Sequence, residues 1–419
     1  MRNHNVSSGD PGKRLAALVP ALFVVLTLAA CGSSNTPSTP TSNAKNRAFI
    51  TNSYSGNLQI VDTQNDTTPL TASTYDQNGN LIQGQPVTIP VSNTATFEAE
   101  SPDHTVTAVY DPTTIAIWFV TNSSETTSGD VPLTSTTSMF LFSPDSATMY
   151  APEPNLAISN QHPGGVEVVT RSSANITATY AVPAASKIAL SPSGQYLLVF
   201  ADNSDSVFLI NLTATTVTPI EITGFARPVN AFFSSDNNTA WVINCGPECG
   251  STNPASVAAL NIPSRKITST VPVGGASVGY LNGTTLYVAG SPVPPGTTST
   301  YDAVNVSNMT RITTNSVAIG DGFHTTMALA PNSKLYIGAN SCSNTSTGCL
   351  SVVDVGSNTA DPPLPPRGAI TALMSVSGRN VIYAIEGGFL HIYDSENDQL
   401  QGTQITFTGA LFGIVQADQ

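Results

Sequence analysis

Four basic residues recur at a similar position in the repeated part of this chain, and together they could bind an anion. Lys187, Arg227, His324 and Arg367 lie four to eight residues before a turn of the Ser-Pro-Asp type. The chain has 14 lysines and arginines against 27 aspartates and glutamates, so a ring of cations would focus anionic ligands. Asp321 is close enough in sequence to orient His324. The alternative is that basic residues simply lie in loops, as charged residues ordinarily do.

Four of the five cysteines form two close pairs, Cys245 with Cys249 and Cys342 with Cys349. An even number of cysteines in an exported chain indicates disulfides. The alternative is a four-thiolate metal site, but three and six intervening residues do not fit the usual spacing of such ligands. We therefore expect two disulfides, each of which pins one loop, and no bound metal.

No other motif in the sequence indicates a catalytic site or a cofactor-binding site. The chain has no Gly-X-Ser-X-Gly elbow, and its scattered histidines do not show the spacing of His-Glu-X-X-His. It also lacks Cys-X-X-Cys-His, the attachment motif of c-type haem. The acidic stretches Asp202–Asp205 and Asp394–Asp398 lack the glycine of a calcium loop, and they are better explained as turns. We expect no cofactor, and the sequence favours a non-enzymatic role without excluding catalysis.

The residues above belong to a phrase of strand, turn and strand that recurs about every 45 residues from Arg47 onward. This period suits a blade of four short strands, the unit of a β-propeller. The predicted fold is therefore all-β, with one propeller over residues 47–419. The recurring turns start at Ser101, Ser143, Ser191, Ser234, Leu281, Ala330 and Ser375.

The first and last copies of the repeat are incomplete in complementary ways. The first copy begins at a second strand, Arg47–Asn52, and continues to a third at Leu58–Asp62. The last residues, Ala410–Ala417, read as a lone first strand. Closure of the ring by this C-terminal strand would complete the first blade and remove the exposed sheet edges. Seven turns plus one composite blade give eight blades; seven remains an alternative if the copy at Ser101 is an insertion.

The segment Ala48–Gln64, AFITNSYSGNLQIVDTQ, resembles the YVTN-type repeat of the lactonase-like propeller superfamily. Phe49-Ile50-Thr51-Asn52 stands at the motif position, and Phe119-Val120-Thr121-Asn122 echoes it in a predicted third strand. The resemblance implies the propeller fold but not one function, because this fold hosts binding modules, lactonases and redox enzymes alike. No lactonase motif matches residue by residue, so no catalytic position is transferred.

Residues 1–30 have the anatomy of a signal peptide. A basic start is followed by the apolar segment Leu15–Thr27, which is short for a membrane span. Leu28-Ala29-Ala30-Cys31 resembles the lipobox of bacterial lipoproteins, and this resemblance implies cleavage before Cys31 and lipidation of its thiol. An ordinary secretory signal with a chance cysteine is the alternative. Gly32 after the lipidated cysteine favours the outer membrane by the family's sorting rule, on its periplasmic side or at the cell surface.

The predicted mature chain is an acidic body on a flexible tether. Removing residues 1–30 takes away three basic residues and one acidic residue, which leaves a net charge of −15. Such a surface argues against nucleic-acid binding. Residues 31–46 carry the lipidated cysteine and a linker rich in Ser, Thr and Pro that cannot form a core. We expect a monomer that contacts the membrane through lipid.

A propeller encloses a central channel, and the residues just before each first strand, including the four basic residues above, should lie at its mouth. Long loops between the second and third strands should share this face of the propeller. They include Glu153–Gly165, Cys245–Pro254 and Ser291–Thr300. Loops on one face of a rigid scaffold commonly carry binding sites. The favoured function is therefore an anchored binding or scaffolding module for a protein or another cell-envelope ligand. The alternative is a lactonase-like hydrolase that acts on a small anionic substrate at the channel mouth.

Overall fold

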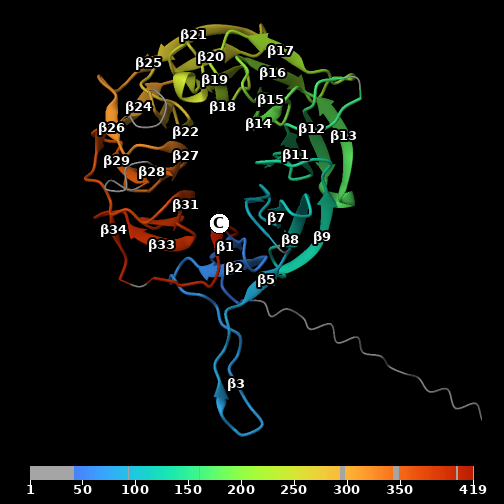
Figure 1. Ribbon diagram of the computed structural model, residues 1–419, viewed down its shortest axis with the longest axis vertical. Coiled ribbons are helices and arrows are strands. Elements are labelled where there is room, and N and C mark those ends of the chain that lie inside the picture. The colour runs from blue at the N-terminus through green and yellow to red at the C-terminus, as the bar shows by residue number, and fades with distance from the viewer. Residues whose placement is uncertain are drawn as a thin grey trace, which may run out of the picture. The chain divides into compact units, whose positions relative to one another are not determined.

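The protein is described by a computed structural model that covers residues 42–418, except 93, 160, 293–297, 343–348 and 403. The chain divides into two units, Met1–Ser38 and Thr39–Gln419. The second unit is a ring of eight antiparallel sheets, each with a four-stranded path (Figure 1). The prediction of an eight-bladed propeller is confirmed, and the seven-bladed alternative is wrong because the copy at Ser101 forms a complete blade.

Within each blade, strands a to d run in order from the ring axis to the rim (Figure 1). The first four blades are β35 (Leu411–Gln416), β1 (Arg47–Asn52), β2 (Asn57–Asp62) and β5 (Thr88–Pro90); β6 (Glu98–Glu100), β7 (Val106–Asp111), β8 (Ala116–Thr121) and β9 (Thr126–Pro132); β10 (Leu141–Phe142), β11 (Thr148–Glu153), β12 (Gly165–Thr170) and β13 (Asn175–Ala181); β14 (Ala185–Leu190), β15 (Tyr196–Ala201), β16 (Ser206–Asn211) and β17 (Ile220–Thr223).

The other four blades follow the same order, and only blade 6 has an additional short strand in its sheet. They are β18 (Pro228–Phe233), β19 (Thr239–Asn244), β20 (Ser256–Asn261) and β21 (Lys266–Pro272); β22 (Val278–Asn282), β23 (Thr285–Gly290), β24 (Ser299–Asn305), β25 (Thr310–Arg311) and β26 (Val317–Ile319); β27 (Phe323–Leu329), β28 (Lys334–Ser341), β29 (Leu350–Asp354) and β30 (Thr359–Ala360); β31 (Ile370–Ser375), β32 (Val381–Glu386), β33 (Phe389–Asp394) and β34 (Gln399–Leu400).

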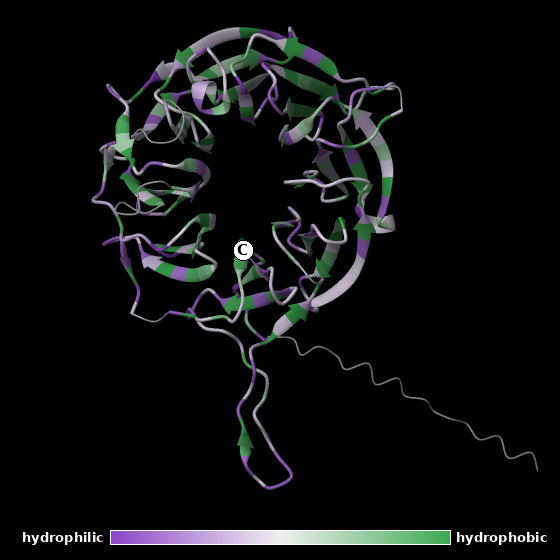
Figure 2. Cartoon of the chain, in the orientation of Figure 1, coloured by the Kyte–Doolittle hydropathy of each residue, from purple (hydrophilic) through white to green (hydrophobic). Residues whose placement is uncertain are grey.

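Both faces of each strand b are buried, as in β1, β15 and β32, and these strands accordingly carry short, nearly continuous apolar runs (Figure 2). In β15, Leu198 and Phe200 pack against blade 5, whereas Leu197 and Val199 pack against blade 3. Successive side chains of a strand point to opposite faces of its sheet. Each blade therefore forms a hydrophobic core with the blade on either side of it. Removing one blade would expose an apolar face on each of its two neighbours.

The ring closes where the two ends of the described chain meet. Strand β35 pairs with β1, with Phe49 opposite Val415 and Ile50 opposite Ile414. The Arg47 side chain reinforces this pairing, because its Nε donates to Asp418 Oδ2 at 2.7 Å and its Nη1 donates to Glu125 Oε1 at 2.9 Å. The predicted completion of the first blade by the C-terminal strand is confirmed.

Polar side chains at the end of strand b hold the segment that leads into strand a. In blade 5, the Asn244 Oδ1 accepts a hydrogen bond from the Ala226 backbone N–H at 3.2 Å. In blade 1, Asn52 Nδ2 donates to the Thr408 carbonyl at 2.8 Å. These clamps fix the d–a segments beside the b–c loops, and the two sets of segments form what we call the loop face of the ring.

Blade 1 differs from the others by a long insertion between its strands c and d. The hairpin of β3 (Thr74–Tyr75) and β4 (Leu81–Ile82) lies at the end of an arm that projects from the ring (Figure 1). Tyr75, Leu81 and Ile82 are exposed on it. The repeat pattern did not predict this arm.

Two 3₁₀ turns are the helical elements of the described residues, η1 (Arg171–Ser173) and η2 (Gly246–Cys249). None of the described residues belongs to a helix that is long and apolar enough to cross a membrane. The apolar segment Leu15–Thr27 and Cys31 lie outside the described residues.

Replacing Arg47 with Ala should destabilise the ring strongly. The change leaves the Glu125 carboxylate, whose side chain is 0% exposed, without its cationic partner, although the Ser42 donors remain, and breaking a buried ion pair costs about 3–5 kcal/mol. Arg171→Ala is the matched control, because its pair with Asp103 is much more exposed and should cost at most about 1 kcal/mol. Urea unfolding measures both free energies, and equal losses would contradict this account of closure.

Candidate functional site

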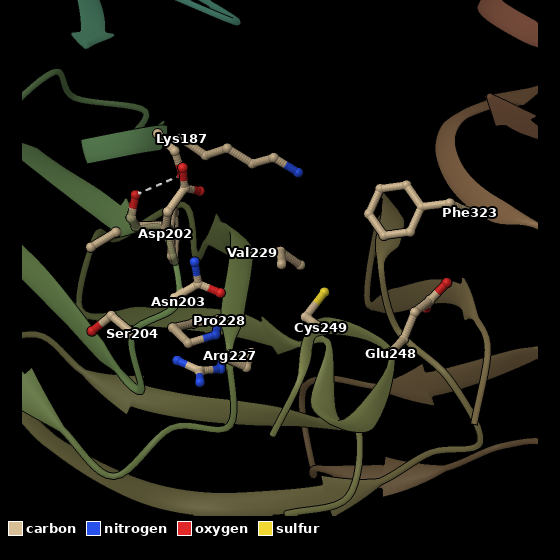
Figure 3. Close-up of a pocket in the computed structure, with 13 residues that line it drawn as sticks. Lys187, Asp202, Asn203, Ser204, Arg227, Pro228, Val229, Glu248, Cys249 and Phe323 are labelled. Carbon is tan, nitrogen blue, oxygen red and sulfur yellow. Dashed lines mark hydrogen bonds between the residues drawn. The ribbon is translucent and has the colours of Figure 1, made fainter. Parts of the chain in front are cut away.

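A cavity of about 370 Å³ lies on the loop face and is lined by blades 4, 5 and 7. We call it the mouth cavity. Its wall includes Lys187 of β14, Arg227 before β18, Phe323 of β27, and Glu248 and Cys249 of η2. Lys187 and Phe323 point toward one another from opposite sides, and η2 lies between their strands (Figure 3). The inner strands thus bring residues 136 positions apart to one site.

Lys187 presents a half-buried amine that has no hydrogen-bond or ion-pair partner among the described residues. Burial lowers the pKa of this amine, and the nearby charge of Asp202 opposes the shift only in part. A cation without a partner in a partly desolvated site gains free energy when an anion binds beside it. Lys187 is therefore suited to anion binding, and in its neutral form it could also act as a base.

Arg227 adds a second cation that is only loosely paired. Its backbone N–H donates to Asp205 Oδ1 at 3.0 Å, but its Nε lies 3.9 Å from the same oxygen. That Nε is buried and has no hydrogen-bond partner. Arg227 also has a φ of 53°, a left-handed conformation that is uncommon for residues other than glycine. Arg227 thus lines the cavity in a strained backbone conformation, and its guanidinium Nε makes no hydrogen bond among the described residues.

Glu248 contributes an acid whose environment disfavours its charge. Burial raises the pKa of this carboxyl, although hydrogen bonds from Ser291 and Ser277 oppose the shift. The Ser291 N–H donates to Glu248 Oε2 at 2.9 Å. The approach requires Gly290, because a Cβ there would lie 2.7 Å from the same oxygen. The mouth cavity therefore combines two cations with an acid that is easier to protonate than usual.

Both predicted disulfides are confirmed. Cys245 pairs with Cys249 and Cys342 pairs with Cys349, with Cα–Cα distances of 5.7 and 5.5 Å. Each bond follows a strand b on the loop face. The first closes η2 and so fixes the positions of Glu248 and Cys249 in the mouth cavity.

The remaining predicted site residues do not line the mouth cavity. His324 follows Phe323 in β27 but is 1% exposed, and burial lowers its pKa to about 4. The imidazole is thus neutral at pH 7, although the Asp321 charge favours protonation. Arg367 is exposed before β31, near the Glu386 carboxyl of blade 8. The structure brings together Lys187 and Arg227 from the predicted set.

Two further groups of buried acids lie outside the mouth cavity. Glu386 is 1% exposed and accepts a hydrogen bond from the Tyr393 hydroxyl, and burial raises its pKa to about 7. In blade 3, Glu153 lies near Glu167. Burial of the Glu153 carboxyl, and next the neighbouring Glu167, raise the pKa of Glu153 to about 9. In the described part of the chain, no three His, Cys, Asp or Glu side chains are placed to hold a metal ion.

The sequence pointed to this face of the ring but missed part of the wall. Glu248 lies in the Cys245–Pro254 loop, which was expected to contribute to binding, but only the two cysteines of that loop were singled out from the sequence. Phe323 was missed because a strand alternates its side chains. His324 had the more reactive side chain, but its neighbour occupies the position that faces the cavity. The signal in the sequence that could have identified Phe323 was this alternation of side chains along the strand.

Comparisons with known proteins agree with the fold. No protein-family model and no curated protein matches this sequence. Among solved structures, the chain is similar to dihydro-heme d1 dehydrogenase NirN in complex with DHE, with a TM-score of 0.63 and 13% identity over 91% of this chain and 77% of that one. It is also similar to Kuenenia stuttgartiensis hydrazine synthase, with a TM-score of 0.53 and 15% identity over 74% and 96% of the two chains.

A third similar structure is a functionally unknown protein from Desulfotomaculum acetoxidans, with a TM-score of 0.51 and 16% identity over 80% of this chain and 96% of that one. At these identities the likeness shows the β-propeller fold and carries no function to this chain. The site must therefore be judged by its own residues.

The buried Glu153 should make the stability of the protein fall as the pH rises. The folded chain keeps a proton on this carboxyl up to a pKa of about 9, whereas the ordinary value is 4.5. Between these values the folded state binds more protons than the unfolded state, so the free energy of unfolding decreases with pH. Glu153→Gln is neutral at every pH and should lose less melting temperature between pH 6 and pH 9 than the wild type.

The exposed Glu396→Gln is the control for this experiment, and its melting temperature should follow that of the wild type at both pH values. An equal fall in Glu153→Gln and the wild type would show that Glu153 is ionised in the folded protein.

Proposed function

We propose that this chain is an exported, lipid-anchored β-propeller that acts as a binding module and holds an anionic group of its ligand in the mouth cavity. The observation that carries the proposal is that Lys187 and Arg227 line the same cavity, and that neither the Lys187 amine nor the Arg227 Nε has a hydrogen-bond partner among the described residues. Charged hydrogen bonds to a carboxylate or phosphate would satisfy both donors. The raised pKa of Glu248 reduces the negative charge that would oppose such a ligand.

The loop face supports this proposal in a second way. The segments that form the mouth cavity are held in place at the ends of strands. The hydrogen bond from Ala226 to Asn244 and the Cys245–Cys249 disulfide fix them further. A pre-organised site loses little conformational entropy when its ligand binds. The ligand's remaining groups would contact the neighbouring b–c loops, which suits either a small molecule or an acidic segment of a cell-envelope protein.

A lactonase-like hydrolase is the second candidate function. The observation that favours it is the pair of opposed shifts in one cavity: burial lowers the pKa of Lys187 and raises the pKa of Glu248. Such shifts bring a base and an acid closer to working pH, as general acid–base catalysis requires. Binding remains the preferred function because it needs only the groups already placed.

The binding proposal predicts that small anions bind in the mouth cavity and that both cations contribute. Citrate, gluconate and inorganic phosphate are suitable calorimetric probes at low ionic strength, where charge attraction is least screened. Lys187→Met and Arg227→Gln should each weaken binding of the best probe about 10-fold or more, since hydrogen bonds to charged groups contribute about 1.5–3 kcal/mol. Lys266→Met, on the rim strand β21, is the control that should leave affinity unchanged.

Unchanged affinity in both cavity variants would contradict the binding proposal. Turnover of δ-gluconolactone that is lost in Lys187→Met and in Glu248→Gln would instead favour the hydrolase.

The anchor proposal predicts that Cys31 carries lipid. In bacterial cells fed a radioactive or clickable palmitate, the full chain should be labelled and should sediment with membranes. Cys31→Ser should remove the label and release the protein from the membrane fraction, because several acyl chains are needed for stable anchoring. Cys249→Ser is the control for the loss of a cysteine elsewhere. Equal labelling of Cys31→Ser and the wild type would contradict lipidation at this residue.

A further inference from the structure

A second cavity, of about 400 Å³, lies between blades 1 and 2 on the loop face. We call it the rim cavity. It is lined by Pro90–Ser92 at the end of β5, by Asp111 at the end of β7, and by Thr114, Trp118 and Thr127 of blade 2. It shares no lining residue with the mouth cavity, so it does not depend on the proposed function.

Three residues that line the rim cavity each carry a buried polar atom that has no hydrogen-bond partner among the described residues. These atoms are Ser92 Oγ, Asp111 Oδ2 and Trp118 Nε1. Buried polar groups in native proteins are nearly always satisfied by protein, water or ligand, and each unsatisfied one costs about 1–3 kcal/mol. Three such atoms in the lining of one cavity therefore indicate a site that a polar molecule completes.

Asp111 defines the charge of this site. The residue is 0% exposed, and burial opposes its ionisation, but hydrogen bonds from Thr94, Thr113 and Thr114 outweigh burial and lower its pKa. These bonds all reach Oδ1; the Thr113 N–H, for example, donates at 2.8 Å. Oδ2 is left as a charged acceptor that requires a donor from outside the protein.

The rim cavity disfavours anions. None of its lining residues is a lysine, arginine or histidine, so an anionic ligand would meet the Asp111 carboxylate without compensation. A ligand ammonium group could donate to Oδ2 and stack on the indole, but it could not accept the Trp118 N–H. The ligand must therefore both donate and accept hydrogen bonds at neighbouring positions.

Hydroxyl groups meet this requirement, because each one donates one hydrogen bond and accepts others. One hydroxyl could donate to Asp111 Oδ2 and accept from Trp118 Nε1, while a neighbouring hydroxyl bonds Ser92. The apolar surfaces of Pro90, Val91 and the indole suit the C–H faces of a sugar ring. We propose that the rim cavity binds a neutral saccharide unit, in addition to the anion site at the channel mouth.

Trp118 allows this proposal to be tested with a local signal. The chain has two tryptophans, Trp118 and Trp241, so Trp241→Phe leaves Trp118 as the only indole. In this background, intrinsic fluorescence is titrated with neutral mono- and oligosaccharides of glucose, mannose, galactose and N-acetylglucosamine. Choline serves as the ammonium probe, and citrate serves as the ligand class expected at the mouth cavity.

We expect a saturable change in Trp118 emission with at least one neutral saccharide and none with choline or citrate. Asp111→Asn should weaken the saccharide about 10-fold or more, and Ser92→Ala about 2- to 10-fold, the ranges for charged and neutral hydrogen bonds. Lys187→Met should not change this affinity. Ser173→Ala, an exposed serine of blade 3, is the matched control.

Ser92→Ala removes one hydroxyl and no backbone contact, so it keeps the test valid if Asp111→Asn fails to fold. A saturable response to choline alone would overturn the proposal in favour of an ammonium site. No change in Trp118 emission with any of the saccharides, or equal saccharide affinity in the wild type and Ser92→Ala, would also overturn the proposal.

Discussion

The pairing of β35 with β1 is the contact on which the rest of the structure depends. It joins residues at the two ends of the described chain, and Arg47 extends it through Asp418 and Glu125. With the ring closed, every inner strand has a neighbour on both sides, and the starts of all eight converge on one opening. Lys187, Arg227 and Phe323 meet there although they belong to three different blades.

Much of the fold could be predicted because it repeats. The period of about 45 residues predicted the number of blades. The first copy of the repeat lacks a first strand and the C-terminus has a lone first strand, and this complementarity predicted how the ring closes. In blade 1, the expected strand Arg47–Asn52 has the observed bounds, and the expected strand Leu58–Asp62 begins one residue after the observed one. The arm that carries β3 and β4 escaped prediction because an insertion follows no period.

The site was less predictable because it depends on where individual side chains point. The d–a position of Lys187 and Arg227 placed them on the loop face, but the same reasoning included His324, which strand alternation turns away from the cavity and buries. The partners that a side chain lacks are also invisible in the sequence. Nothing in the sequence distinguishes Arg227, whose Nε makes no hydrogen bond among the described residues, from Arg47, which is fully engaged in ring closure.

The two cavities differ in the polar groups that lack hydrogen-bond partners among the described residues. In the mouth cavity these groups are the Lys187 amine and the Arg227 Nε, and among the residues of the rim cavity they are an acceptor, a donor and a hydroxyl. The protein would thus offer two sites of opposite electrostatic character on one face of a rigid scaffold.

Titration of the Lys187 amine distinguishes an anion-binding site from an ordinary loop lysine. The chain after residue 30 has four lysines, at 45, 187, 266 and 334, which dimethylation with ¹³C would resolve in an NMR spectrum. The account predicts that Lys187 titrates below its ordinary value of 10.5, and that a saturating anion such as citrate raises this pKa, because bound negative charge favours the ammonium form. A Lys187 that titrates at the ordinary value for lysine, and whose pKa does not change when anion is added, would contradict the anion site.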